Sequence, residues 1–379
     1  MYDVTDYGRM LAHEERIDAY AEALERVVDS DSVVVDIGTG TGIFALIAAR
    51  LGARRVFAID PNDAIEIARE LVTANGYGDR VECIQAMSTD VQLPEPATIV
   101  VSDITGALPL MGGRISALVD ARERLLRAGG VLLPHGDALF AALAESPRQY
   151  SLVSNWDEHD YGFDMGAARE LACNNWWKER RPSSRLLTEG QCWARLDYTA
   201  IADSTRRGEF QCEVTESGTA HGVLVWFETE LIDGLVFSGS LSPGSVYGRV
   251  FFPLRTPVDV ARGDSFTCTL TAEPAEEDYA WRWETRIVDA RTGDVKAGFR
   301  QSTLEGVAVS ASARERQSPR YMPELDADGE IVAFALDCMR GDLTLSQIAE
   351  KLFARFPDLF DDADDALRFT ASLSQEYSR

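Results

Sequence analysis

Short apolar runs alternate with amphipathic segments over the first third of the chain. The runs are rich in β-branched residues, as is typical of parallel strands buried on both faces. The segments between them repeat apolar side chains every three or four residues, which predicts helices. The predicted strands cover residues 32–36, 55–60, 81–85, 98–102 and 130–133, and the predicted helices cover residues 14–28, 43–51, 64–75 and 116–126. This alternation predicts an α/β, Rossmann-like fold with helices on both faces of a parallel sheet.

The pattern changes after residue 150, where strands follow one another without intervening helices. Gly, Pro and Asp turns separate predicted strands at residues 191–201, 208–214, 221–231, 247–254, 265–273 and 280–289. Such a series predicts an antiparallel, β-barrel-like domain.

Two further segments follow neither pattern. Residues 151–181 are rich in aromatic side chains and too irregular for a strand, which predicts an arm that packs on another surface. Helical periodicity returns at residues 331–339, 345–356 and 366–377, with Thr344 as a start signal and Gly341 as a stop, and predicts a small helical module. The expected divisions are 1–30 (N-terminal helices), 31–148 (Rossmann-like domain), 149–182 (arm), 183–319 (β domain) and 320–379 (helical module).

The charge and composition of the chain disfavour several classes of partner and binding site. The formal net charge of −25 over 379 residues disfavours nucleic acid and anionic membrane as partners. No apolar run approaches the roughly 18–20 residues that span a bilayer. Six cysteines without a CxxC spacing, and a start that lacks the features of a secretory signal, favour a cytoplasmic protein with reduced thiols. Four histidines without ligand spacing predict no metal site.

The strongest motif is Asp-Ile-Gly-Thr-Gly-Thr-Gly at residues 36–42, between a predicted strand and a predicted helix. Glycines at such a turn permit positive φ and let the backbone approach a ligand closely. A glycine turn alone also fits NAD binding or a turn that binds nothing. However, Asp36 precedes the first glycine, and Asp60 ends the second strand, where a carboxylate can accept both ribose hydroxyls. Together these residues resemble class I S-adenosylmethionine-dependent methyltransferases, which implies cofactor contacts from Asp36, Gly38, Thr39, Gly40, Gly42 and Asp60.

A second stretch resembles one family within that class. Residues 7–20, Tyr-Gly-Arg-Met-Leu-Ala-His-Glu-Glu-Arg-Ile-Asp-Ala-Tyr, are similar to a segment of the protein arginine methyltransferases. The resemblance implies that Met10 lies against the sulfonium and that Arg16 pairs with the methionine carboxylate; a solvated helix charge is the alternative for Arg16. Met87 and Ser88 occupy the adenine-contact position of the family, which usually has an acid where Ser88 stands.

The resemblance continues through the arm and covers roughly residues 5–290. Tyr-Gly-Phe-Asp-Met at residues 161–165 is similar to the family's dimerisation arm, so a homodimer formed through residues 151–181 is implied. The chain therefore looks like a divergent, bacterial-type member of the family.

The acceptor loop departs from the family pattern. Two glutamates hold the guanidinium in the family, whereas this chain has Asp103 and Gly112 at the matching positions. The family's Thr-His-Trp loop is replaced by Ser-Val-Tyr-Gly-Arg at residues 245–249. We therefore expect an acceptor other than arginine, with Asp103 as base or anchor and Tyr247 beside it. Arg114 and Arg249 would suit an anionic group of the substrate. The alternative for both arginines is a solvated surface position, and the alternative for Asp103 is an acid that caps the following turn.

Three functions remain open from the sequence. The first is a methyltransferase (EC 2.1.1.-) acting on a nitrogen or oxygen of a peptide or protein side chain. The second is a methyltransferase for a small molecule, and the third is a non-catalytic S-adenosylmethionine-binding protein. Residues 320–379 resemble the helical half of PqqD-like winged-helix modules, which bind leader peptides; a structural helical cap is the alternative.

Overall fold

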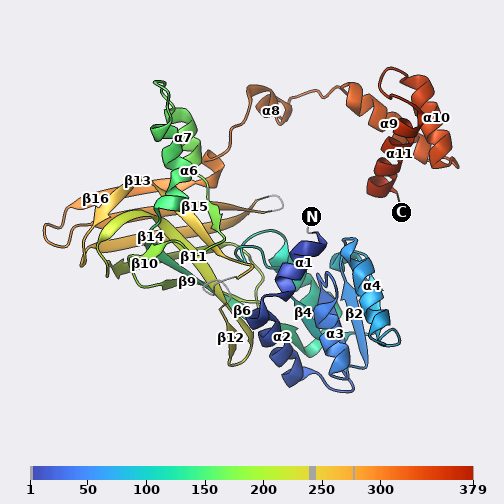
Figure 1. Ribbon diagram of the computed structural model, residues 1–379, viewed down its shortest axis with the longest axis horizontal. Coiled ribbons are helices and arrows are strands. Elements are labelled where there is room, and N and C mark those ends of the chain that lie inside the picture. Colours follow the sequence, from blue (N-terminus) through green and yellow to red (C-terminus); the bar gives the residue numbers. More distant parts are fainter. Residues whose placement is uncertain (1–2, 239–244, 276–277, 379) are drawn as a thin grey trace. The chain divides into compact units, whose positions relative to one another are not determined.

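The computed structural model describes residues 3–238, 245–275 and 278–378. The chain forms two compact units, Met1–Val307 and Ala308–Arg379 (Figure 1). The first unit contains the parallel sheet, the antiparallel sheets and the arm, and the second contains helices.

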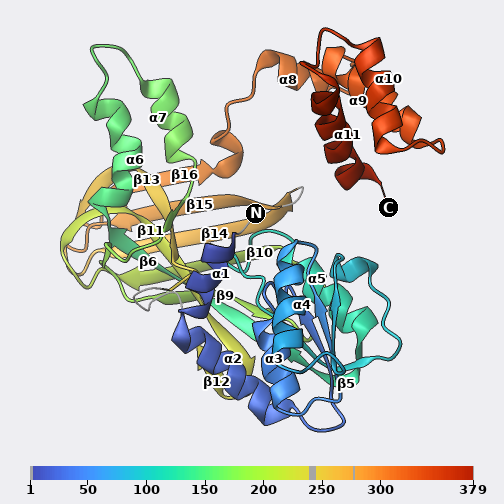
Figure 2. The same cartoon turned by 45° about the vertical axis from the view of Figure 1, so that its right-hand side comes forward.

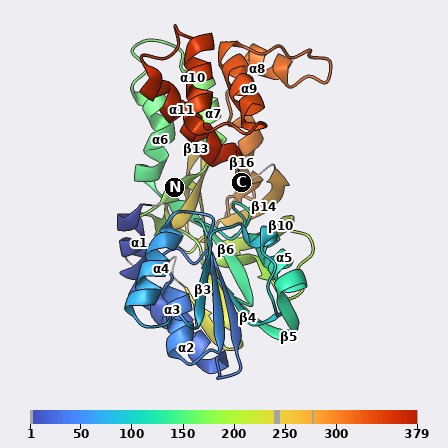
Figure 3. The ribbon, with the colours of Figure 1, turned by 90° about the vertical axis from the view of Figure 1, so that its right-hand side faces the viewer.

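A five-stranded parallel sheet forms the core of the N-terminal part. Its order in space is β3 (Val81–Ile84), β2 (Arg55–Ile59), β1 (Val33–Ile37), β4 (Ala97–Ser102) and β5 (Leu126–Leu133). The helices here are α1 (Val4–Leu11), α2 (Glu14–Val27), α3 (Ile43–Arg50), α4 (Ala64–Ala74) and α5 (Arg114–Asp120), with short turns η1 (Ser88–Asp90) and η2 (Ala121–Leu125). Figure 3 shows α3 and α4 on one side of the sheet and α5 on the other. The predicted Rossmann-like fold is confirmed.

The central strand β1 is buried along its whole length, which explains the three consecutive valines at residues 33–35. The strand order runs outward from β1 in two directions, through β2 to β3 and through β4 to β5. Ligands of such sheets bind in the crevice at the carboxyl ends of the strands where the order reverses. Here that point lies between β1 and β4.

Two antiparallel sheets follow (Figure 1). The larger has the order β7 (Trp177–Glu179), β13 (Arg249–Val260), β11 (Gly218–Ile232), β6 (Gly136–Glu145) and β8 (Arg185–Leu186), with β12 (Leu235–Phe237) on β11 and β9 (Gln191–Asp197) on β6. The smaller has the order β10 (Arg206–Glu213), β14 (Ser265–Ala275), β15 (Asp278–Val288) and β16 (Val295–Ser302), followed by η3 (Thr303–Glu305).

Strand β6 was not expected, and it lies within the 31–148 division assigned to the Rossmann-like domain. It pairs antiparallel with β11 over nine residue pairs from Gly222–Ala144 to Glu230–Gly136. Its apolar sequence would suit either sheet, so only the pairing partner assigns it to the antiparallel domain.

The arm consists of two helices, α6 (Pro147–Glu158) and α7 (Gly166–Cys173), which lie side by side in Figure 2. The sequence predicted an arm too irregular for a strand. The structure shows that most of this segment is helical, that the turn of residues 159–165 joins the two helices, and that the short strand β7 lies near its end. In that turn Tyr161 has φ 51°, and the side chains of Tyr161 and Phe163 are 85% and 70% exposed.

The second unit has its own apolar core. Helices α8 (Ala311–Arg316), α9 (Ala327–Met339), α10 (Leu345–Arg355) and α11 (Ala363–Tyr377) follow one another, and Ile331, Ala335 and Leu352 are buried among the last three. The predicted start of α10 is a capping box between Thr344 and Gln347. The resemblance to PqqD-like modules stays a prediction. Among the described residues, none of the helices is both long and apolar enough to cross a membrane.

Candidate functional site

The turn between β1 and α3 brings three left-handed glycines to the carboxyl edge of the parallel sheet. Gly38, Gly40 and Gly42 have φ values of 71°, 54° and 86°, a conformation that side chains disfavour. A Cβ atom on Gly38 would lie 2.1 Å from Cγ2 of Ile104, and one on Gly40 would lie 2.5 Å from Cε1 of Tyr7. The turn therefore requires glycine for its conformation and for the close approach of its neighbours.

The Asp36 side chain stabilises this turn through hydrogen bonds. Its Oδ2 accepts hydrogen bonds from Thr39 Oγ1 at 2.6 Å and from the Ala45 amide at 3.1 Å. Burial raises the pKa of the Asp36 carboxyl to about 7, against the opposing effect of these hydrogen bonds. Both Asp36 and Thr39 are buried, so they position the glycine turn.

Asp60 links the glycine turn to the end of β2. Its Oδ2 accepts from the Gly40 amide at 2.9 Å, and its Oδ1 accepts from the Asn62 amide at 2.9 Å. Oδ1 also accepts from Asn62 Nδ2 at 3.0 Å, so only Oδ2 has a further lone pair. The carboxylate is therefore fixed at the strand end and retains acceptor capacity on Oδ2 for a ligand.

Arg16 connects the N-terminal helices to the carboxyl end of β4. Its side chain is 7% exposed and forms an ion pair with Asp103, whose side chain is 5% exposed. The other terminal nitrogen donates to the Met10 carbonyl at 2.9 Å, and the guanidinium lies 5.5 Å from the centre of the Phe44 ring. Arg16 is therefore buried and paired, and it is not the solvated helix charge that the sequence left open as an alternative.

Tyr247 completes the surroundings of the Asp103 carboxylate. Its hydroxyl lies 2.7 Å from Oδ1 and 2.8 Å from Oδ2 of Asp103. Burial raises the pKa of Tyr247 well above its ordinary value, and the Asp103 charge raises it further. The phenol therefore stays protonated and donates to Asp103.

Met87 and Ser88 follow β3 at the same edge of the sheet. Met87 is 53% exposed, while Ser88 is buried. The Ser88 carbonyl accepts from Arg124 Nη2 at 2.6 Å, which fixes the backbone of this segment. An exposed thioether beside a fixed backbone can cover one face of a planar ring.

The structure corrects the expectation for Arg249 and Arg114. Arg249 is buried in an ion pair with Glu179, with its Nε donating to Glu179 Oε2 at 2.8 Å. Arg114 is also buried and lies 3.2 Å from Asp137 Oδ2. A buried guanidinium keeps a carboxylate partner because an unpaired charge is costly, so neither arginine offers a free cation to an anionic group. The Gly112 amide donates to Asp278 Oδ1 at 2.9 Å, so the carboxylate that lies against this position comes from β15 and not from the loop.

His13 is a residue of the site that the sequence analysis did not identify. It is 6% exposed, and neither ring nitrogen has a hydrogen-bond partner within the described part of the chain. Its ring centre lies 5.8 Å from that of Phe237 and 6.1 Å from that of Tyr247. Each buried polar group without a partner costs about 1–3 kcal/mol. The family segment at residues 7–20 contained this residue, but only the tertiary contacts bring it to Tyr247.

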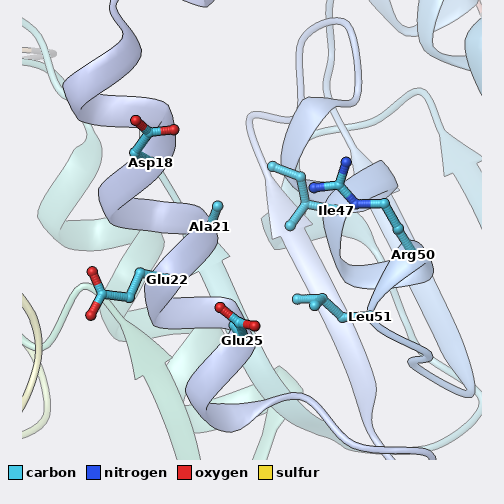
Figure 4. A pocket seen from close by; sticks show the side chains of 7 residues that line it. All are labelled: Asp18, Ala21, Glu22, Glu25, Ile47, Arg50 and Leu51. Atoms are coloured by element: carbon cyan, nitrogen blue, oxygen red, sulfur yellow. The ribbon is translucent and has the colours of Figure 1, made fainter.

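A surface cavity of about 620 Å³ lies between α2 and the end of α3 (Figure 4). Charged side chains dominate its lining, among them Asp18, Glu22, Glu25 and Arg50. It contains none of the residues of the glycine turn or of the Asp103 cluster, so we assign it no role in the chemistry.

The comparisons with known proteins first define a class. Residues 19–156 match the family described as ribosomal protein L11 methyltransferase (PrmA), and residues 136–286 match the arginine methyltransferase oligomerization subdomain. The fold also resembles the PRMT1 enzyme–prozyme heterotetramer of Trypanosoma brucei solved with AdoHcy. The TM-score is 0.71 at 21% identity, over 78% of this chain and 96% of that one. The class is that of methyltransferases with an arginine methyltransferase architecture.

Relatives with higher identity then define the family. The arginine N(omega)-methyltransferase of Streptomyces achromogenes subsp. streptozoticus is 30% identical over 269 residues, 69% of this chain and 74% of that protein. The probable protein arginine N-methyltransferase 6 of Arabidopsis thaliana is 31% identical over 253 residues, 62% of this chain. The chain spans 56% of the length of this plant relative. The chain belongs to the protein arginine methyltransferase family.

The residues at the carboxyl edge fit the family's cofactor, S-adenosylmethionine. The left-handed glycines admit a ligand beside the backbone, and Asp60 Oδ2 keeps acceptor capacity for a ribose hydroxyl. Arg16 is already paired with Asp103, but its Nε has no hydrogen-bond partner among the described residues, so one donor of the cation remains for an amino acid carboxylate. All three features lie at the carboxyl edge of the parallel sheet, after β1, β2 and β4.

Proposed function

We propose that this chain is an S-adenosylmethionine-dependent methyltransferase that modifies a nitrogen or oxygen of a peptide or protein side chain. The observation that carries the proposal is the Asp103 carboxylate, held by Arg16 and Tyr247 next to the glycine turn. A Cβ on Gly38 would meet Ile104, the neighbour of Asp103, so cofactor turn and carboxylate lie close together. Family membership supports the reaction type.

The cofactor supplies an electrophilic methyl group on a sulfonium. In this proposal Asp60 accepts from the ribose, Met87 and Ser88 lie along the adenine, and Arg16 and Met10 hold the methionine end. Arg16 then serves two carboxylates, that of the cofactor and that of Asp103. Its position between them couples cofactor binding to the orientation of Asp103.

Asp103 and Tyr247 hold the acceptor in line with the methyl group. Displacement at a methyl carbon requires a free lone pair and a collinear approach, so positioning supplies most of the rate. Asp103 accepts a hydrogen bond from the acceptor's N–H or O–H and so fixes the direction of that lone pair. The buried surroundings exclude water from the reacting atoms.

The same geometry disfavours a guanidinium as the acceptor. Asp103 already faces the charge of Arg16 and the hydroxyl of Tyr247. Gly112 has no carboxylate of its own, and the Asp278 carboxylate beside it already accepts from the Gly112 amide. A second cation at this site would lie near Arg16 without compensation. A hydroxyl, amide or imidazole acceptor brings no such charge. The names of the relatives point to arginine, so this part of the proposal rests on the local geometry alone.

We also propose that the chain forms a homodimer through residues 151–181. The arm carries exposed aromatic side chains at its tip and an apolar groove of about 520 Å³ along its side, lined by Leu152, Trp156, Trp176 and Trp177 among others. Exposed apolar patches of this kind are typical of interfaces. The match of residues 136–286 to an oligomerization subdomain supports this assembly.

The test begins with the cofactor and proceeds to the acceptor. Calorimetry measures S-adenosylhomocysteine binding to the wild-type chain, to Asp60→Ala and to the exposed control Asp79→Ala. Transfer of a tritiated methyl group is then followed to blocked pentapeptides with Ser, Asn, His, Lys or Arg at the centre, and to free arginine. We expect binding that Asp60→Ala weakens and Asp79→Ala does not, followed by transfer to an uncharged side chain. Absence of binding contradicts the function, and preferred turnover of free arginine or the Arg peptide contradicts the acceptor class.

A further inference from the structure

His13 is placed at the site by the first turn of α2. The Arg16 and Ile17 amides donate to the His13 carbonyl at 3.1 and 3.2 Å, so the backbone of His13 starts the helix while its side chain makes no cap. Three residues later, Arg16 pairs with Asp103. The imidazole therefore lies on the same helix start that positions the Asp103 carboxylate.

The rings around His13 come from the antiparallel domain. Phe237 ends β12, and Tyr247 precedes β13; both rings lie within about 6 Å of the imidazole, centre to centre. Neither ring offers a hydrogen bond to the imidazole nitrogens, which have no partner among the described side chains. The imidazole is therefore a buried polar group whose hydrogen-bonding capacity is unused next to the acceptor site.

The surroundings also fix the protonation state of His13. Burial lowers its pKa below the ordinary value, and the Arg16 charge lowers it further, while Glu15 and Asp103 oppose the shift to a smaller extent. The remaining titratable neighbour, Tyr247, stays protonated and uncharged. A neutral imidazole has one N–H and one nitrogen lone pair, so His13 can accept a proton at neutral pH.

Asp103 is less suited to this task than His13. Arg16 and the Tyr247 hydroxyl both bind its oxygens, so its lone pairs are largely occupied. Such a carboxylate can orient an acceptor, whereas both ring nitrogens of His13 are without a hydrogen-bond partner among the described residues.

We propose that His13 is a catalytic residue that takes the proton lost by the methyl acceptor. This role rests on the methyltransferase function proposed above and deepens it. The acceptor's nitrogen or oxygen forms a bond to the methyl carbon while the sulfur–carbon bond breaks and its electron pair stays on sulfur. The acceptor's proton passes to the lone pair of His13, and the resulting imidazolium later releases it to water. The charge of an imidazolium would repel a guanidinium, so the substrate class is a neutral N–H or O–H side chain.

The decisive variant is His13→Gln, because an amide keeps hydrogen-bonding groups but does not take up a proton near neutral pH. The matched control is His221→Gln, since burial also lowers the pKa of His221 and its Nδ1 accepts from the Ser146 amide, away from Asp103. The probes are the blocked pentapeptides described above and tritiated S-adenosylmethionine. A second readout is the ring ¹³C signal of labelled histidine, titrated with S-adenosylhomocysteine bound.

We expect His13→Gln to lower turnover by ~100-fold or more and to remove the acidic limb of the pH–rate profile. Its affinity for S-adenosylhomocysteine should stay within about twofold of wild type, and His221→Gln should keep both rate and profile. In the wild-type chain, the His13 signal should report a neutral ring near neutral pH.

Several outcomes would overturn the role of His13. They are an unchanged rate and pH profile in His13→Gln, an equal loss of rate and cofactor affinity, or an imidazolium signal near neutral pH. A wild-type chain that binds S-adenosylhomocysteine yet methylates none of the pentapeptides also overturns it. Failure of the wild-type chain to bind S-adenosylhomocysteine is a different result, which contradicts the proposed function itself.

Discussion

The hydroxyl of Tyr247 meets both oxygens of Asp103, at 2.7 and 2.8 Å, across a sequence separation of 144 residues. Asp103 follows the fourth strand of the parallel sheet, and Tyr247 precedes a strand of the antiparallel domain. This contact joins the two domains at the acceptor site. The acceptor geometry therefore depends on how the domains pack.

The first prediction concerns this contact. Tyr247→Phe removes the hydroxyl and keeps the ring, so Asp103 loses one of its two fixed partners. We expect turnover to fall by ~10-fold and the affinity for S-adenosylhomocysteine to stay near wild type. Steady-state kinetics and calorimetry measure the two effects, with Tyr377→Phe in the C-terminal unit as control. A loss of cofactor affinity with unchanged turnover would contradict the assignment of Tyr247 to the acceptor.

The second prediction concerns the carboxylate itself. Asp103→Asn keeps the shape but removes the charge that orients the acceptor and pairs with Arg16. We expect turnover to fall by ~100-fold or more. Because the pair is buried, the variant should also unfold at a lower temperature, which calorimetry detects. Undiminished turnover would show that Asp103 does not act on the acceptor.

The third prediction concerns the cofactor turn. Gly38→Val places a Cβ against Ile104 and forces a β-branched residue to φ 71°, and Asp60→Ala removes the anchor of Gly40. Each should weaken S-adenosylhomocysteine binding by ~2 kcal/mol or more, about 30-fold in Kd. Gly78→Ala serves as control, since its Cβ would meet no atom within 4 Å. Calorimetry with unchanged affinity in both site variants would refute the assignment.

The fourth prediction concerns Asp36 and pH. The pKa of Asp36 is raised to about 7 in the folded chain from its ordinary value of 3.8, so the folded state holds this proton more tightly than the unfolded state. The resulting contribution to stability is present below pH 4 and is lost as pH rises through 7. Asp36→Asn cannot ionise and lacks this dependence. We therefore expect the variant to gain stability relative to wild type between pH 5 and 8, by about 1.4 kcal/mol per pH unit at most.

Urea unfolding of both proteins across this pH range, without cofactor, measures the difference. Other titrating groups contribute equally to the two proteins and cancel. A difference that is constant with pH would mean that Asp36 is ionised throughout.

The fifth prediction concerns assembly. Tyr161→Ser with Phe163→Ser removes the exposed aromatic rings at the tip of the arm, and we expect the homodimer to dissociate into monomers. Light scattering measures the mass, and Val236→Ser, a 58% exposed apolar residue on β12, is the control. A wild-type chain that is monomeric at high concentration contradicts the dimer directly.

Local sequence was sufficient for the parallel sheet and for the glycine turn. The predicted runs end within one or two residues of the observed strands β1 to β4. For β1, β2 and β4 the reason is that a strand buried on both faces has apolar side chains at almost every position. The left-handed conformations at Gly38, Gly40 and Gly42 are likewise local, since the backbone there requires a residue without Cβ. Helix α10 begins at the expected Thr344 because a capping box involves only neighbouring residues.

Long-range packing decided the acceptor site. Arg114 and Arg249 were expected to face the cleft, yet Asp137 and Glu179 bind them in the interior. Strand β6 joined the antiparallel sheet for the same kind of reason, since its apolar pattern did not specify which sheet it pairs with. His13 could be identified as a residue of the site only from its contacts with Phe237 and Tyr247 in the folded chain. Charge partners and ring contacts depend on residues far away in the chain, and the energetic cost of burying a charge or an imidazole arises only after those residues pack together.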